Sequence, residues 1–91
     1  MSWQQVVIPN VGGAVEFGHD IIRTFIARYK AAGRPAAVAV HHARNDAGDH
    51  LYYFSPAAVA LAPEVLRAYH ATACAEPPRV EGLRRVPLED V

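Results

Sequence analysis

A β-hairpin signal in the middle of the chain limits the possible folds more than any other feature. Residues 36–44 and 50–55 have the pattern of two strands, and the turn sequence "NDAGD" separates them. A type I turn with Gly48 in the left-handed conformation gives a three-residue loop. Asn45 then pairs with Asp49, and the two strands run antiparallel from there.

The turn also fixes the register, and with it the two faces of the hairpin, because side chains alternate along a strand. The pairs on one face are Arg44 with His50, His42 with Tyr52, and Val40 with Phe54. The pairs on the other face are Ala43 with Leu51, His41 with Tyr53, and Ala39 with Ser55. Val38, Val40 and Phe54 are the bulkier apolar residues, so we expect the first face to pack against helices.

A helix is predicted on each side of the hairpin. From Val15 to Ala32, apolar residues recur at helical spacing and Gly33 follows as a left-handed cap; these residues are Phe17, Ile21, Ile22, Phe25, Ile26 and Tyr29. Ser55-Pro56 is a helix start, with serine as N-cap and proline in the first turn. The apolar stripe that follows reaches Ala73, and Pro63 predicts a kink or a division into two helices.

Two weaker strands complete the pattern. Residues 3–9 end at a proline and precede the first helix, and a final strand is expected within residues 80–86. The order is then β-α-β-β-α-β. With right-handed crossovers this predicts an α+β fold of the ferredoxin-like plan, with a four-stranded antiparallel sheet and two helices on one face.

Length and charge restrict the class of protein. Ninety-one residues make one small domain, residues 1–91, and nine basic residues balance nine acidic ones. This balance argues against nucleic acid as a partner, because phosphate binding needs a basic surface. RNA-recognition domains share the βαββαβ order, but residues 50–55 lack their basic, glycine-bearing signature.

The sequence shows no membrane-spanning run and no signal peptide, and Cys74 is its only cysteine. A soluble, cytoplasmic protein without a membrane partner is therefore expected. Seventeen alanines, and eight arginines against one lysine, are typical of a GC-rich bacterial genome.

The histidines of the hairpin are the first candidates for chemistry. His41 and His42 point to opposite faces, so no three-histidine cluster forms, and no metal site is expected. His42 and His50 share a face with Arg44 and Tyr52 near the turn. This set suits a small anionic ligand or a polarised carbonyl. The alternative interpretation is a polar rim that keeps the hairpin soluble.

Other candidates are weaker. "NVGG" at 10–13 precedes a helix but lacks a phosphate-loop signature. Cys74 lies one helical turn after His70 only if the second helix reaches it, and a small buried cysteine is the more common situation. His19 reads as an exposed helix residue, and "LRR" at 83–85 as a basic edge strand.

The outer face of the hairpin predicts a homodimer. It carries no charge, with Leu51 and Tyr53 as anchors and His41 near the edge; its full set is Ala37, Ala39, His41, Ala43, Leu51, Tyr53 and Ser55. The first hypothesis is therefore a non-enzymatic binding or interaction module that self-associates through its sheet and needs no cofactor. The second is a small enzyme of the dimeric α+β barrel kind with a His/Tyr cleft. The third is a regulatory protein that binds a protein partner through the hairpin.

Overall fold

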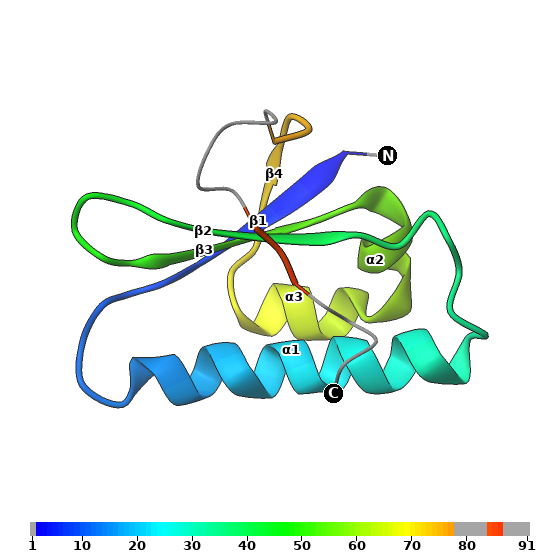
Figure 1. Cartoon of the computed structure of the whole chain (residues 1–91), viewed down its shortest axis with the longest axis horizontal. Coiled ribbons are helices and arrows are strands. Elements are labelled where there is room, and N and C mark those ends of the chain that lie inside the picture. Colours follow the sequence, from blue (N-terminus) through cyan, green and yellow to red (C-terminus); the bar gives the residue numbers. More distant parts are fainter. Residues whose placement is uncertain (1, 78–83, 87–91) are drawn as a thin grey trace.

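The structure, a computed structural model, describes residues 2–77 and 84–86. The elements follow the order β1 (Trp3–Ile8), α1 (Ala14–Ala31), β2 (Val40–Arg44), β3 (His50–Phe54), α2 (Pro56–Leu61), α3 (Pro63–Ala68), β4 (Thr72–Cys74) and β5 (Arg84–Arg85). The strands form one sheet in the order β4-β1-β3-β2-β5, and every neighbouring pair is antiparallel. The three helices lie on one side of this sheet (Figure 1). The predicted α+β class and antiparallel sheet are confirmed.

The hairpin has the predicted register. Val40 pairs with Phe54, His42 with Tyr52 and Arg44 with His50. Gly48 has a φ of +83° and its N–H donates to the Asn45 carbonyl at 2.9 Å, as the turn requires. The strand before the turn is shorter than predicted, because regular pairing begins at Val40 and not at residue 36.

Helix α1 agrees with the predicted segment to within one residue at each end. The Gly33 N–H donates to the Lys30 carbonyl and the Arg34 N–H to the Tyr29 carbonyl, which is the Schellman closure expected of a left-handed Gly33. Most of the predicted apolar stripe is buried or partly buried, but Phe17 is 59% exposed. Phe17 lies in the first turn of α1, ahead of the buried part of the stripe, which begins at Ile21.

The second helical region divides at Pro63, as the sequence indicated. Ser55 is the N-cap of α2, with its Oγ accepting from the Ala58 N–H at 3.3 Å, and α2 ends at Leu61. Pro63 then starts α3, which ends at Ala68. The helix therefore does not continue to Ala73 as the stripe suggested.

The end of α3 brings the chain into a strand that was not predicted. His70 has a φ of +57°, and the Ala71 N–H donates to the Leu66 carbonyl at 2.9 Å, so the helix closes in a second Schellman motif. Thr72–Cys74 then forms β4 and pairs with Trp3–Gln5 of β1. This pairing places β4 at the sheet edge, where it covers only the first half of β1.

The predicted last strand, residues 80–86, falls partly outside the described residues. Within it, Arg84–Arg85 forms β5, which pairs with His41 and His42 at the β2 edge. Within the described residues, the sheet thus has five strands where four were predicted, and the fold has three helices where two were predicted.

The core lies between the helices and the side of the sheet that carries Val40 and Phe54. The Phe25 and Phe54 rings are 4.5 Å apart, and both side chains are fully buried. Gly18 lets α1 approach the sheet closely, because a Cβ there would lie 3.3 Å from the Tyr52 hydroxyl. Among the described residues, no helix is long and apolar enough to cross a membrane.

Candidate functional site

The hairpin histidines predicted to share a face form a directly bonded pair. His42 Nε2 and His50 Nδ1 are 2.8 Å apart, and the two rings are nearly parallel. The Tyr52 ring packs on His42 with a centroid distance of 4.8 Å. One imidazole must donate and the other accept, so each histidine uses one ring nitrogen on its neighbour. Burial raises the pKa of the Tyr52 phenol, which therefore stays protonated near neutral pH.

Arg44 does not join these three rings. Its guanidinium donates from Nε and NH2 to the Gly48 carbonyl, at 3.3 and 3.1 Å, and so closes the hairpin turn. The predicted set of His42, Arg44, His50 and Tyr52 is therefore brought together only in part. Among the described residues, no group of three or more His, Cys, Asp or Glu side chains could hold a metal ion.

Asp49 ties the turn to the segment between β1 and α1. Asn45 Nδ2 donates to its Oδ2 at 3.0 Å, and the Asn10 N–H donates to its Oδ1 at 2.7 Å. The Asn45 side-chain hydrogen bond, followed by the Asn10 backbone hydrogen bond, lowers the pKa of the Asp49 carboxyl. This end of the hairpin is therefore a braced turn whose polar groups are used internally.

The predicted interface residues His41, Leu51 and Tyr53 all lie on the side of the sheet opposite the helices, and all three are half-buried. The His41 ring meets the Trp3 ring edge-on at a centroid distance of 5.4 Å. Gln5 Nε2 donates to the Tyr53 hydroxyl at 3.0 Å. Ser55, expected on this side, is instead 3% exposed and turned into the fold, because it caps α2.

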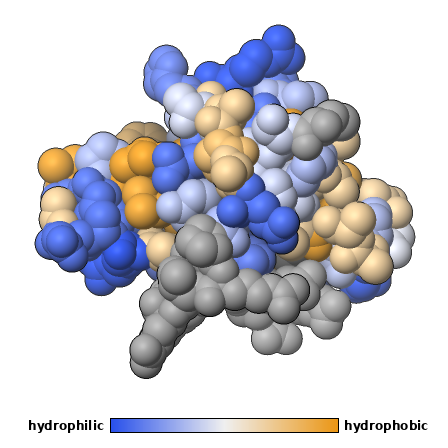
Figure 2. All heavy atoms as spheres, turned by 90° about the horizontal axis from the view of Figure 1, so that it is seen from above, coloured by the Kyte–Doolittle hydropathy of each residue, from blue (hydrophilic) through white to orange (hydrophobic). Residues whose placement is uncertain are grey.

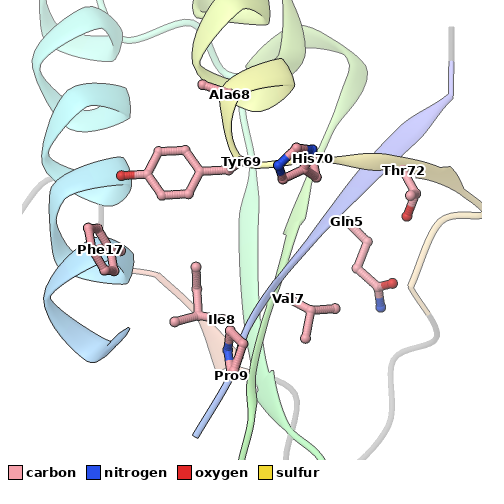
Figure 3. A pocket seen from close by; sticks show the side chains of 9 residues that line it. All are labelled: Gln5, Val7, Ile8, Pro9, Phe17, Ala68, Tyr69, His70 and Thr72. Carbon is pink, nitrogen blue, oxygen red and sulfur yellow. The ribbon is translucent and has the colours of Figure 1, made fainter. Parts of the chain in front are cut away.

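A groove that sequence reasoning did not find lies beside β1, with a volume of about 750 Å³. Its walls come from β1, the start of α1, the end of α3 and the start of β4 (Figure 3), and include Val7, Ile8, Phe17, Tyr69, His70 and Thr72. Val7 and Phe17 are among the most exposed large apolar residues, at 46% and 59%. The described lining contains no Asp, Glu, Lys or Arg side chain. The groove therefore has the size and apolar character of a ligand site.

The backbone of β1 forms the floor of this groove. In antiparallel pairing, alternate residues direct N–H and C=O to opposite neighbours. The Asn45 N–H donates to the Asp49 carbonyl, so Asp49 directs its backbone groups to β2. By alternation, His50 and Tyr52 direct their backbone groups to β1. Their partners there, Ile8 and Val6, direct theirs to β3. Val7 must then direct its N–H and C=O to the other edge.

Strand β4 does not reach Val7. It pairs with Trp3, Gln4 and Gln5 only, and no backbone hydrogen bond of Val7 to that side occurs within the described part of the chain. The residue that would stand opposite Val7 is His70. Its N–H donates to the Arg67 carbonyl at 3.1 Å, and its positive φ is incompatible with a strand. The edge is thus left open by the way α3 ends.

The remaining sequence candidates are scattered. His19 is exposed on α1, and Gly13 of "NVGG" is the N-cap of α1 with a φ of +82°. Cys74 lies on β4, and burial raises the pKa of its thiol. Helix α3 ends at Ala68, so the condition for a one-turn spacing of His70 and Cys74 is not met. In "LRR", Arg84–Arg85 forms β5, and residue 83 lies outside the described residues.

No protein-family model, curated protein or solved structure matches the chain significantly.

Proposed function

We propose that the chain is a small, soluble, cytoplasmic binding module that self-associates through the side of its sheet opposite the helices, here called the open face. The observation that carries the proposal is the absence of charge on β1 to β4 at this face. By the register, the residues there are Trp3, Gln5, Val7, His41, Ala43, Leu51, Tyr53, Thr72 and Cys74. A sheet that faces water normally alternates apolar with charged or strongly polar residues.

The open face is not a continuous apolar patch. Seen from above the sheet, apolar and hydrophilic residues are interspersed (Figure 2). Aromatic rings and amide groups, such as those of Trp3, Tyr53 and Gln5, give a surface that can pack on a partner without burying an unpaired charge. Strand β5 adds to the sheet at its outer edge, beside β2. This arrangement favours a second copy of the chain over water.

The area of the open face sets the expected strength of the dimer. Four strands about 4.8 Å apart and five residues of about 3.4 Å each give roughly 330 Å² of projected area. Standard interfaces bury about 800 Å² per partner. Protruding side chains make the accessible area larger than this projected area. The dimer is nevertheless expected to be weak, with dissociation at micromolar concentrations.

Sedimentation velocity from about 5 to 200 μM, a range suited to micromolar dissociation, tests the proposal. Trp3 is the only tryptophan and lies on the open face, so its fluorescence should shift over the same range. Leu51→Glu with Tyr53→Glu should give a monomer. The control is Ala27→Glu with Ala60→Glu, two exposed positions on the helices, and it should still dimerise. A monomer at every concentration, or a dimer that survives the open-face variant, would overturn the proposal.

We further propose that β1 to β4 form a ferredoxin-like domain. The order β4-β1-β3-β2, with all helices on one side, supports this assignment. Helices α2 and α3 together then take the place of the second helix, and β5 is an addition at the β2 edge. A crystal structure in which β4 left the β1 edge would contradict it.

The two other hypotheses receive less support. An enzyme with a His/Tyr cleft needs His42 and His50 to line a hollow, and the groove described above is lined by other residues. At the hairpin, Arg44 already directs two of its five N–H donors to the Gly48 carbonyl, which leaves fewer donors for a small anionic ligand. A protein partner bound through the hairpin turn would contact a loop whose polar groups are already internally bonded.

A further inference from the structure

We infer that the groove beside β1 binds an extended, uncharged peptide segment that adds a short strand at Val7. Binding of this kind combines main-chain hydrogen bonds to a sheet edge with pockets for alternate side chains. The inference concerns a different partner from the second copy proposed above and does not depend on self-association.

The open edge supplies the main-chain part of the recognition. A single residue of an antiparallel strand placed opposite Val7 would both donate to its carbonyl and accept from its N–H. The chain cannot supply that residue itself, because His70 is committed to the end of α3. His70 holds a left-handed conformation that a non-glycine residue adopts only at an energetic cost. The open edge is therefore maintained at the expense of local strain.

The walls of the groove supply the side-chain part. They come from both sides of the sheet plane, with Val7 and Thr72 on the open face and Ile8, Phe17 and Tyr69 on the helix side (Figure 3). A flat apolar ligand would need a wall on one side of the sheet only. An added strand directs alternate side chains to the two sides of the sheet. The residue paired with Val7 would therefore place its side chain on the open face, and its two neighbours would point toward Phe17 and Tyr69.

Charge complementarity defines the chemistry of the partner. The described lining has no Asp, Glu, Lys or Arg, and His70 is its one imidazole. A charged side chain entering the groove would lose solvation without gaining a partner. The edge from Val6 to Pro9 is also short, because proline has no N–H to continue the ladder. The segment recognised is thus about three residues long, at about 3.4 Å each, with apolar residues flanking a small central one.

The probe is an acetylated, amidated pentapeptide of sequence serine-valine-threonine-valine-serine, titrated into the ¹⁵N-labelled chain to about 10 mM, a range suited to weak binding. Amide shifts should change at Val7 and Phe17 and saturate. Methylating the amide nitrogen of the central threonine removes the donor to the Val7 carbonyl. That analogue should bind about tenfold more weakly, the loss expected for one hydrogen bond.

Two variants give the matched test on the protein. Val7→Pro removes the N–H that faces the groove and spares the β3 ladder, so the fold is kept and affinity should fall about tenfold. Asp46→Pro, at an exposed position of the hairpin turn that accepts proline and lies outside the groove, is the control and should bind normally. No saturable shift, equal binding of the methylated peptide, or equal binding of a single capped valine would overturn the inference.

Discussion

Removing the Ser55 hydroxyl should destabilise the fold by more than an ordinary helix cap does. Ser55 Oγ accepts from the Ala58 N–H at 3.3 Å and from the Ala39 N–H at 2.9 Å, and it donates to the Ala37 carbonyl at 3.1 Å. One hydroxyl therefore caps α2 and also holds the segment that leads into β2. The residue is 3% exposed, so water cannot readily replace it.

The loss on Ser55→Ala can be worked out from these contacts. Loss of the N-cap contributes about 1 kcal/mol. The Ala39 N–H loses its acceptor in a half-buried position, which adds about 1–3 kcal/mol. The Ala37 carbonyl belongs to an exposed residue and can bond to water, so it adds little. The sum is about 2–4 kcal/mol, or a fall in Tm on the order of 10–20 °C for a domain of this size.

Urea unfolding followed by circular dichroism measures this loss at pH 7. The control is Thr24→Ala, which also deletes a bonded hydroxyl: Thr24 Oγ1 donates to the Asp20 carbonyl at 3.0 Å within α1. That variant should change stability by no more than about 0.5 kcal/mol, because alanine is the better helix former. A loss below about 1 kcal/mol for Ser55→Ala would show that the contacts to Ala37 and Ala39 contribute nothing.

Two further variants test the hairpin brace and the end of α3. Because its pKa is lowered by Asn45 and then by Asn10, the Asp49 carboxylate stabilises the fold above its unfolded pKa of about 4. Asp49→Ala should therefore lower Tm at pH 7, and the gap to wild type should close as the pH falls below about 4; a gap unchanged at pH 2.5 would refute the brace. His70→Gly should raise stability by up to about 1 kcal/mol in urea unfolding, because glycine removes the left-handed strain. A destabilised glycine variant would show that the imidazole makes compensating contacts.

The hairpin could be predicted from the sequence because several local signals agree. Gly48 supplies the left-handed residue, Asn45 and Asp49 close the turn, and alternation fixes which side chains share a face. The same agreement explains why Ser55 and Gly33 could be placed at helix ends. These positions depend on short-range chemistry that the sequence displays directly.

Strand β4 could not be predicted for an equally local reason. Leu66, Tyr69 and Ala73 continue a helical stripe, and the residue that ends the helix is a histidine where glycine is the usual signal. His70 therefore gave no sign of a turn. Because the helical stripe was continued to Ala73, β4 was missed and the last strand was expected only within residues 80–86. The same extension suggested a helical spacing of His70 and Cys74 that the fold does not have.

The groove was missed because it forms where β1 has no neighbouring strand. Its residues come from β1, α1, the end of α3 and the start of β4, and its floor exists only because β4 is too short to cover Val7. One signal was present: Phe17 continued the α1 stripe one turn beyond the core and is 59% exposed. A large apolar residue on a helix, outside the core that the helix packs against, indicates a possible binding surface.

The open face and the groove can be occupied together, because Val7 contributes different groups to each. Its side chain stands on the open face, where a second copy would pack against it. Its N–H and C=O lie in the plane of the sheet and point to the edge, perpendicular to that contact. A face-to-face dimer would thus cover one wall of each groove and leave both edges accessible. The peptide affinity of the Leu51→Glu, Tyr53→Glu monomer should accordingly lie close to that of the wild type, and a complete loss would mean that the partner copy completes the groove.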